Sequence, residues 1–423
     1  MRKILCNFIS SNYTNNRLYT ISTMAFLKKI NKILAKPMIR AIKIYQYTLS
    51  PDKWLPSFWL KGRICSHEPH CSQYSIWVFK RYGFWPGIFY ATDRVLHCTA
   101  SMHKTYDPEH YRVVFVSSAP IGVPFLKHLA HDKRFEVIWV VTQCDKPSGR
   151  WMEMWENIIK KTANNLNNSK FWILNSEFIK TPTKLNPEKS EEGREFAQRL
   201  KEKNPDLLVV IAYGKIIPQA ILDIPRVAPI NIHGSLLPKY RGASPIQSTL
   251  LHNDKETGIT IMKMDATMDT GDMIDILRFT IPFNWTTKDL IDEMKKIGPK
   301  FLNETLRKYG KKLLWEVKQQ ENKANYCKKI EKESWLIDPR KDSIETIYNK
   351  YRAFYLWPKI YFMLNDKRVI IEELKLSEPL YNSNDELSLF QWKALHPAII
   401  DIQLKPEGKK TMPRKEFLNW YIR

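Results

Sequence analysis

Short apolar runs alternate with helical patterns in the middle of this chain. Three runs rich in β-branched and aromatic residues are predicted to be buried strands, at residues 111–117, 135–142 and 207–212. Between the second and third runs, residues 190–202 carry apolar positions at helical spacing and are predicted to form a helix. This alternation indicates a parallel sheet with helices on its faces, which is an α/β fold.

The pattern changes toward the C-terminus. Residues 311–333 are rich in lysine and are predicted to be a linker. A helix is predicted near residues 343–355, followed by strands at 359–364 and 368–376. Periodicity alone therefore predicts a small, mostly β domain over residues 334–423.

Two polar side chains stand where another strand is predicted to end. If residues 229–233 form a strand end, Asn231 and His233 point to the same face, because residues two apart in a strand do so. In open α/β sheets, ligands bind beyond the carboxyl ends of the strands. The spacing alone is more often typical of a polar strand end than of a catalytic pair, so both interpretations stay open at this point.

These side-chain types suit the transfer of a one-carbon group. An amine that attacks a formyl carbon builds negative charge on the formyl oxygen and positive charge on the amine nitrogen. Asn231 can donate a hydrogen bond to the oxygen, and His233 can serve either need. A carboxylate such as Asp269 would orient the imidazole and favour its charged form.

Seven short motifs follow one another between residues 142 and 410. The most specific reads Asn-Ile-His-Gly-Ser-Leu-Leu-Pro-Lys-Tyr-Arg-Gly-Ala-Ser-Pro-Ile at residues 231–246, and Asp-Thr-Gly-Asp follows at residues 269–272. The others lie at residues 142–150, 212–218, 324–330, 352–358 and 406–410. In this order the motifs resemble the methionyl-tRNA formyltransferase family, over roughly residues 111–423.

The resemblance implies a Rossmann-like formyltransferase domain at residues 109–310, followed by an OB-like β-barrel that binds tRNA. It implies transfer of the formyl group of 10-formyltetrahydrofolate to the amino group of methionyl-initiator tRNA, with no metal. The implied catalytic residues are Asn231, His233 and Asp269; the implied donor-binding residues are Tyr213, Gly214, Ser235, Leu236, Leu237 and Pro238; the implied tRNA-binding residues are Arg150, Lys409 and Lys410.

The chain departs from the family's pattern at two places. The family carries basic residues in the loop after Arg150, where this chain reads Trp-Met-Glu-Met-Trp-Glu at residues 151–156. The family also has Gly-Thr-Pro after its first strand, where this chain has Ser-Ser-Ala at residues 117–119. These differences concern the fine contacts to the substrate rather than the type of reaction.

The first quarter of the chain carries a separate group of motifs. Residues 65–74 read Cys-Ser-His-Glu-Pro-His-Cys-Ser-Gln-Tyr, residues 81–84 read Arg-Tyr-Gly-Phe, and residues 106–108 read Tyr-Asp-Pro. They resemble the membrane protein insertion efficiency factor family, over about residues 38–108. The cysteines and histidines lack the spacing of a zinc finger, and the resemblance implies no metal. We expect a small, mostly α module, preceded by an extension at residues 1–37.

Residues 24–49 interleave six lysines and arginines with apolar residues and contain no acidic residue. This composition is typical of a helix that lies on an anionic membrane surface. The alternative is a basic helix packed on its own domain. The net charge of +23 and the pI near 9.5 agree with a polyanion or an anionic membrane as partner.

Cysteine usage and hydropathy bear on the cellular compartment. The six cysteines are scattered and do not form the disulfide framework of a secreted domain. No apolar run approaches the about 18 residues that a spanning helix needs. We therefore expect a cytoplasmic monomer. Its expected partners are the folate donor, the initiator tRNA and, through the N-terminal module, the anionic inner-membrane surface.

Two other functions remain open from the sequence. One is a membrane-insertion accessory protein whose formyltransferase-like part binds RNA or folate without catalysis. The other is a formyltransferase that acts on an amino-sugar nucleotide. The intact set of Asn231, His233 and Asp269 favours catalysis, and the basic Glu-Gly-Lys-Lys segment at residues 407–410 favours tRNA.

Glycine is scarce, since there are 14 glycines and 14 tryptophans. Trp54, Trp151, Trp335 and Trp420 stand where the resembling families tend to carry glycine, whereas Trp357 stands where the family itself has tryptophan. We interpret these tryptophans as glycines. In this interpretation the gene uses UGA as a glycine codon, and its UGA codons were translated as tryptophan. The interpretation predicts that the indoles of Trp151 and Trp335 are exposed.

Overall fold

The computed structural model describes residues 19–48, 67–68, 71–96, 105–106, 110–143, 145–148, 153–168, 177–180, 184–311, 313–377, 390–391, 394–395 and 399–421. The chain divides into two compact units, Met1–Glu109 and His110–Arg423. Each unit is described by itself below.

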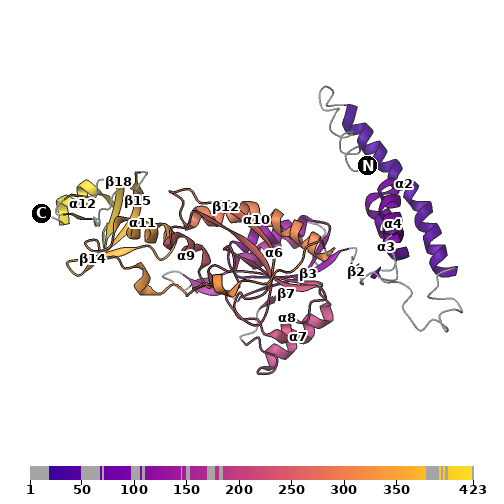
Figure 1. The fold of residues 1–423 in the computed structure, drawn as a ribbon, viewed down its shortest axis with the longest axis horizontal. Helices are drawn as coiled ribbons and strands as arrows, with labels where there is room; N and C mark the ends of the chain where they lie inside the picture. Colours follow the sequence, from indigo (N-terminus) through magenta and orange to yellow (C-terminus); the bar gives the residue numbers. More distant parts are fainter. Residues whose placement is uncertain are drawn as a thin grey trace. The chain divides into compact units, whose positions relative to one another are not determined.

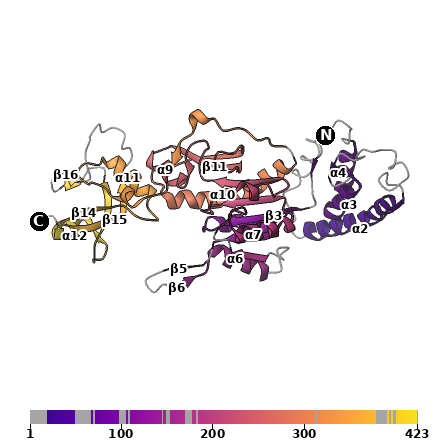
Figure 2. The same ribbon diagram turned by 90° about the horizontal axis from the view of Figure 1, so that it is seen from below.

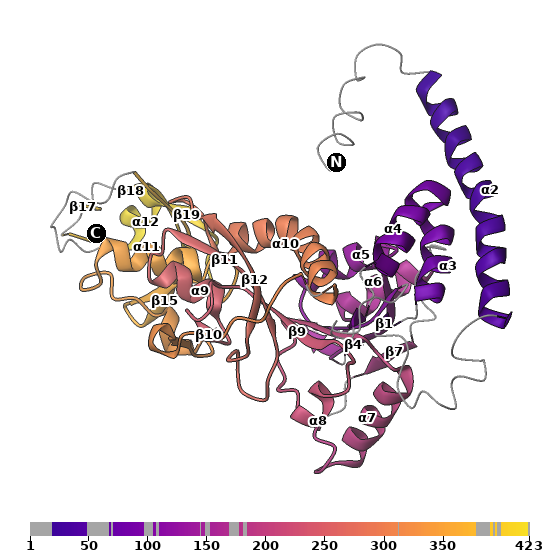
Figure 3. The same ribbon diagram turned by 45° about the vertical axis from the view of Figure 1, so that its right-hand side comes forward.

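In its described part, the first unit consists of three helices around a small core. They are α2 (Tyr19–Thr48), α3 (Cys71–Tyr82) and α4 (Phe84–Leu96), and α2 lies alongside the other two (Figure 3). The buried core residues are Ala35, Tyr74, Trp77, Val78, Phe79 and Ala91. Two short strands, β1 (His67–Glu68) and β2 (Thr105–Tyr106), pair in parallel.

A glycine makes the tight turn between α3 and α4. Gly83 has φ +84°, a conformation that side chains with a Cβ rarely adopt, and a Cβ there would lie 2.3 Å from Asn31 Nδ2. Asn31 also accepts a hydrogen bond from the backbone N–H of Trp85 at 3.1 Å. The turn therefore brings the start of α4 against α2.

The second unit contains a seven-stranded sheet in the order β12-β11-β9-β8-β3-β4-β7. Five strands are parallel, and β11 and β12 complete one edge in antiparallel pairing. Their bounds are β3 (Tyr111–Ser117), β4 (Phe135–Thr142), β7 (Glu177–Lys180), β8 (Leu207–Ile211), β9 (Ala228–His233), β11 (Glu256–Lys263) and β12 (Met273–Thr280). The strands predicted at 111–117, 135–142 and 207–212 are confirmed, and so is the α/β fold.

Helices cover both faces of this sheet (Figure 1). On one side lie α7 (Glu191–Lys203) and α8 (Gln219–Leu222), whose apolar residues share a core with β3, β4 and β8. On the other side lie α5 (Gly122–His131), α6 (Ile158–Asn168) and α10 (Thr287–Gly310). A hairpin of β5 (Lys146–Ser148) and β6 (Glu153–Trp155) extends away from α6 (Figure 2).

The C-terminal part forms a four-stranded antiparallel sheet in the order β14-β15-β18-β19. Its elements are α11 (Ile344–Ala353), β14 (Tyr361–Leu364), β15 (Lys367–Leu376), β18 (Ile399–Pro406), β19 (Met412–Pro413) and α12 (Arg414–Tyr421). Where an OB-like barrel was expected, the described residues form this four-stranded sheet with two helices.

The C-terminal sheet and the part that contains the seven-stranded sheet share one hydrophobic core. Leu250, Ile281 and Leu290 belong to the same buried cluster as Ile347 and Phe354 of the C-terminal part. Polar contacts join the parts as well. The Thr287 hydroxyl donates to the backbone carbonyls of residues 352 and 353. The predicted division into residues 109–310 and 334–423 therefore falls within one compact unit.

Among the helices that the structure describes, none combines the length and the apolar composition needed to cross a membrane.

Candidate active site

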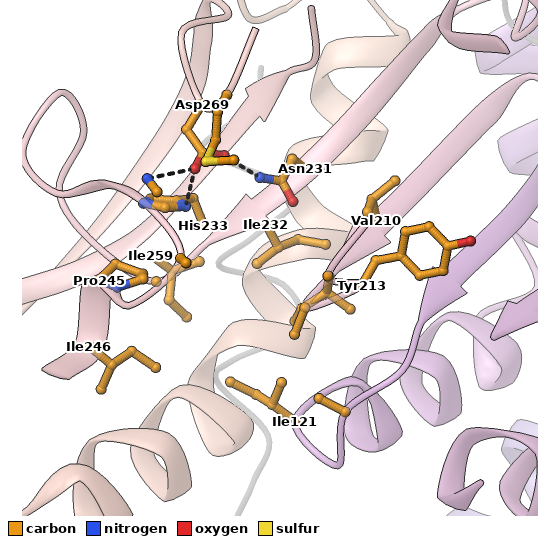
Figure 4. A pocket seen from close by; sticks show the side chains of 18 of the residues that line it. Ile121, Val210, Tyr213, Asn231, Ile232, His233, Pro245, Ile246, Ile259 and Asp269 are labelled. Atoms are coloured by element: carbon orange, nitrogen blue, oxygen red, sulfur yellow. Dashed lines mark hydrogen bonds and ion pairs between the residues drawn. The ribbon is translucent and has the colours of Figure 1, made fainter. Parts of the chain in front are cut away.

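The carboxyl end of β9 carries two polar side chains into one cavity. Asn231 and His233 are two residues apart on this strand, and both line the cavity (Figure 4). The strand is fixed on both sides, by β8 in parallel pairing and by β11 in antiparallel pairing. The expected placement at the end of a strand, with both side chains on one face, is what the structure has.

Asp269 joins these two residues from the loop between β11 and β12. Its Oδ1 accepts a hydrogen bond from Asn231 Nδ2 at 3.1 Å, and its Oδ2 lies 3.6 Å from His233 Nδ1 (Figure 4). The backbone N–H of Gly242 donates to the same Oδ2 at 2.9 Å. The structure therefore brings together the three residues that the sequence pointed to.

The hydrogen bonds of His233 define the chemistry of its ring. Its Nε2 lies 2.9 Å from the backbone carbonyl oxygen of Tyr240, which can only accept, so Nε2 carries the hydrogen. In the neutral ring, Nδ1 is then the basic nitrogen. If Nδ1 takes up a proton, the Asp269 carboxylate beside it stabilises the resulting charge.

The amide of Asn231 keeps donor capacity. An amide nitrogen carries two hydrogens, and Asp269 uses one of them. The second can donate to an oxygen bound in the cavity. The site thus offers a hydrogen-bond donor and a base two residues apart on one strand.

The cavity has a volume of about 700 Å³ and mostly apolar walls. It lies beyond the ends of β8 and β9, beside the turn that leads into α5. Its walls include Ile121, Tyr213, Gly214, Ile246 and Ile259. Cavities of this size and character bind small organic ligands, with a few polar groups setting their orientation.

The other predicted donor-binding residues lie differently. Residues 235–238 are not among those that line the cavity. Polar groups of two of them hold the loop after β9 in place. The Ser235 hydroxyl donates to the Lys239 carbonyl at 2.7 Å, and the Leu237 N–H donates to Thr260 Oγ1 at 3.1 Å. Leu236 and Pro238 are half-buried in the same loop.

Two of the predicted tRNA-binding residues, Lys409 and Lys410, are not among the residues that line the cavity. Lys409 and Lys410 are exposed in the turn between β18 and β19. Arg150 lies outside the described residues.

A buried arginine beside the site was missed from the sequence. The Arg241 side chain is 0% exposed, and its guanidinium donates to Gln319 Oε1 at 2.9 Å and to the Glu321 carboxylate at 2.7 and 2.9 Å. The hydrogen bond to Glu321 raises the pKa of Arg241, and the same contact lowers the pKa of Glu321. The Arg-Gly pair of the 231–246 motif was a signal for Arg241. Gln319 and Glu321, within a segment predicted to be a linker, had none.

The same segment forms a short parallel ladder with the loop after β9. Strand β13 (Tyr326–Cys327) pairs with β10 (Arg241–Gly242). A Cβ on Gly242 would lie 2.2 Å from the Cys327 carbonyl oxygen, so only glycine permits this approach. Burial raises the pKa of the Cys327 thiol.

Trp335 is not exposed as predicted. Its ring is half-buried, with its centroid 5.6 Å from that of Trp357 and 6.4 Å from that of Tyr361. The prediction of an exposed indole is therefore wrong for Trp335. Trp54 and Trp151 lie outside the described residues, as does the side chain of Trp420.

Comparison with known proteins matches both parts of the chain. A formyl transferase family model matches residues 112–306, a formyl transferase C-terminal domain model matches residues 329–421, and a membrane protein insertion efficiency factor model matches residues 34–110. Both resemblances noted in the sequence are thereby confirmed.

Individual relatives agree with these matches. Methionyl-tRNA formyltransferase of Caldanaerobacter subterraneus subsp. tengcongensis is 35% identical, over 73% of this chain and 96% of that protein. The corresponding protein of Caldicellulosiruptor saccharolyticus is 33% identical, over 73% and 96%. A solved methionyl-tRNA formyltransferase from Clostridium thermocellum is 18% identical, over 63% of this chain and 94% of that chain, with a TM-score of 0.43. The identity and coverage of the Caldanaerobacter and Caldicellulosiruptor proteins show that the chain belongs to the methionyl-tRNA formyltransferase family and is a formyltransferase that also carries a membrane protein insertion efficiency factor domain.

Proposed function

We propose that this enzyme transfers the formyl group of 10-formyltetrahydrofolate to the amino group of methionyl-initiator tRNA. The observation that carries the proposal is the convergence of Asn231, His233 and Asp269 on the wall of a cavity of about 700 Å³. Family membership supplies the reaction type, and the names of the relatives supply the acceptor.

The geometry supports a direct attack of the amine on the formyl carbon. The amide of Asn231 donates to the formyl oxygen as it becomes negatively charged. His233 Nδ1 removes a proton from the attacking amine, and the Asp269 carboxylate stabilises the imidazolium that forms. The new bond joins the formyl carbon to the methionyl nitrogen. The bond from that carbon to N10 of the folate then breaks, and N10 takes the proton from His233.

The size and polarity of the cavity support a folate donor. Pockets for ligands of this size have volumes of roughly 300–1,000 Å³ and apolar walls with few polar groups. The apolar walls suit the flat rings of the donor, and the polar group at the reacting end is Asn231. Lys409 and Lys410, exposed in the β18–β19 turn, are proposed to contact the phosphates of the tRNA.

We assign the first unit to reversible attachment at an anionic membrane surface. One side of α2 packs on α3 and α4 through Ala35 and Met38. This side agrees with the alternative considered for residues 24–49, a basic helix packed on its own domain. The rest of the described surface of α2, apart from the half-buried positions, is exposed and carries two kinds of side chain. It carries the basic residues Lys32, Lys36, Arg40 and Lys43 and the apolar residues Ile30, Ile33, Leu34 and Ile44.

The charge distribution supports the same assignment. Residues 1–109 contain 16 of the 67 lysines and arginines of the chain but only 5 of its 44 acidic residues. Basic residues near an anionic leaflet contribute roughly 1 kcal/mol each to binding, and apolar residues between them add to it. In the described part of α2, both kinds of residue lie on its exposed surface.

A formylation assay tests the proposed reaction. Purified protein is incubated with 10-formyltetrahydrofolate and either methionyl-initiator tRNA or an amino-sugar nucleotide. We expect formyl-methionyl-tRNA as the product and no formylated sugar. Turnover of the sugar alone would assign the site to the other acceptor, and turnover of neither would make this part a binding module.

A further inference from the structure

We infer that Gln319 is a positioning residue for the catalytic carboxylate, and that Arg241 holds Gln319 in place. The inference rests on the proposed function, because it assigns the catalytic role to Asp269. It makes the segment after α10 a part of the active site. Neither residue lines the cavity, so both act through other groups rather than on the substrate.

Gln319 is hydrogen-bonded to the loop that carries Asp269. Its Nε2 donates to the backbone carbonyl of Asp269 at 2.8 Å and to that of Gly271 at 2.8 Å. The side chain is buried, with 8% of its surface exposed. Both hydrogens of the amide are therefore used on two carbonyls of one loop, away from competing water.

The loop needs such support because its backbone conformation is unusual. Asp269 has φ +57°, in the left-handed region that residues other than glycine rarely adopt. Gly271 lies so close to the neighbouring strand that a Cβ would be 1.9 Å from the Lys263 carbonyl oxygen. The direction of the Asp269 carboxylate follows from this backbone, so a shift of the loop would turn the carboxylate away from Asn231 and His233.

Arg241 fixes the other end of Gln319. Its Nε donates to Gln319 Oε1 at 2.9 Å, which determines the orientation of the amide and points Nε2 at the loop. The guanidinium itself is held by the carboxylate of Glu321 and the hydroxyl of Tyr326. A buried guanidinium is stable only with partners of this kind.

The two sides of the network meet at Asp269. Gly242 directly follows Arg241, and its N–H donates to Asp269 Oδ2 at 2.9 Å. The carboxylate is thus oriented directly through Gly242, and its backbone is oriented through Gln319. Arg241 contributes to both contacts with Asp269. Its side chain donates a hydrogen bond to Gln319, and its backbone is joined directly to Gly242.

Substitutions that keep the size of Gln319 test the inference. Gln319→Glu keeps an acceptor for Arg241 but replaces the donor by an oxygen that faces two carbonyl oxygens. Gln319→Met keeps the volume and removes both functions. Gln320→Glu is the matched control, since it is the same change at the next residue, which is exposed.

We expect kcat for tRNA formylation to fall about 10- to 100-fold in both Gln319 variants, the scale of a misplacement of about 1 Å at a reacting centre. KM for the folate donor and for tRNA should stay within about twofold, because neither substrate touches Gln319. The Gln320→Glu control should match the wild type. Circular dichroism and thermal unfolding establish the folded fraction, and kcat is calculated per folded enzyme.

Two results would overturn the inference. One is a kcat of Gln319→Glu within about twofold of the wild type. The other is a parallel rise of both KM values with the fall in kcat, which is the behaviour of a general structural defect. The proposed function fails separately, if the wild-type protein itself does not formylate methionyl-tRNA.

Discussion

The imidazole of His233 has an acceptor beside each of its nitrogens. The carbonyl of Tyr240 takes the hydrogen of Nε2, and the carboxylate of Asp269 lies beside Nδ1. This arrangement holds the ring in one orientation. The orientation of His233 therefore depends on the loop that contains Tyr240 and on the loop that contains Asp269.

Single substitutions should separate these roles from the folding of the enzyme. Asn231→Ala removes the donor for the formyl oxygen, and His233→Ala removes the base. Each should lower kcat/KM by at least about a hundredfold, as is usual for an oxyanion donor or an acid–base group. His131→Ala, an exposed histidine on α5, is the matched control. Undiminished turnover in both active-site variants would contradict the assignment.

At the scale of an element, α10 depends on a close contact with α5. A Cβ on Gly298 would lie 2.5 Å from Phe125 Cζ and 2.9 Å from Ile259 Cδ1. The absence of a side chain at Gly298 therefore lets α10 pack tightly over α5 and β11. This packing supports β11, which pairs with β9, the strand that carries Asn231 and His233.

Gly298→Ala should destabilise the second unit. Overpacking of this kind costs about 1–3 kcal/mol in the free energy of unfolding, which exceeds the gain of about 1 kcal/mol from the higher helix propensity of alanine. Lys300→Ala, at an exposed position of the same helix, should change the free energy of unfolding by about 0.5 kcal/mol or less. Equal midpoints of urea unfolding for the two variants would show that the contact relaxes freely.

The regular elements were predictable because the apolar residues of each follow a local pattern typical of a helix or a strand. The runs at 111–117 and 135–142 are rich in β-branched and aromatic residues, and the structure has strands over the same residues. The helix predicted at 190–202 is found one residue later, at Glu191–Lys203, with the Ser190 hydroxyl accepting from the Gly193 N–H. Such elements form from local patterns that later packing does not reverse.

The segment from Gln319 to Cys327 was not predictable in the same way. Its strand β13 has two residues and no period, and its contacts are made to residues about 50 to 85 positions earlier. Lysine-rich composition therefore indicated a linker, although the segment packs against the site. The grouping of Asn231, His233 and Asp269 was predicted through its motifs, whereas the polar contacts that support this group depend on tertiary structure alone.

At the scale of the molecule, the shared core affects how tRNA binding can be tested. Deleting residues 334–423 would uncover Leu250, Ile281 and Leu290, which pack against the C-terminal part. A loss of activity after such a deletion would then report on folding. Charge changes at exposed residues avoid this problem.

The double variant Lys409→Glu with Lys410→Glu should raise KM for tRNA several-fold and leave KM for the folate donor unchanged. Each lost phosphate contact should also reduce the slope of log affinity against log salt by about 1. Lys189→Glu with Lys201→Glu changes the charge equally at exposed positions on the α7 side of the sheet and serves as the control. Equal effects of the two double variants would show that only net charge matters.

Removal of the first unit should abolish membrane binding and spare catalysis. Full-length protein should sediment with vesicles that contain anionic lipid, and added salt should weaken this binding. The truncation that begins at Tyr111 should stay in the supernatant and keep its formylation rate, because the second unit is compact by itself. Equal sedimentation of both proteins would place the membrane contact elsewhere, and vesicles of neutral lipid are the control.

The pairing of β13 with β10 also decides where this enzyme can be recombined with its relatives. A crossover near residue 311 would replace Gln319 and Glu321 by the relative's own residues, which would then face the native Arg241. A crossover after Ile330 would keep the native set, and only the apolar core would need to match. For building chimeras, the module boundary therefore lies after Ile330. This is some twenty residues beyond residue 311, where the composition of the chain changes.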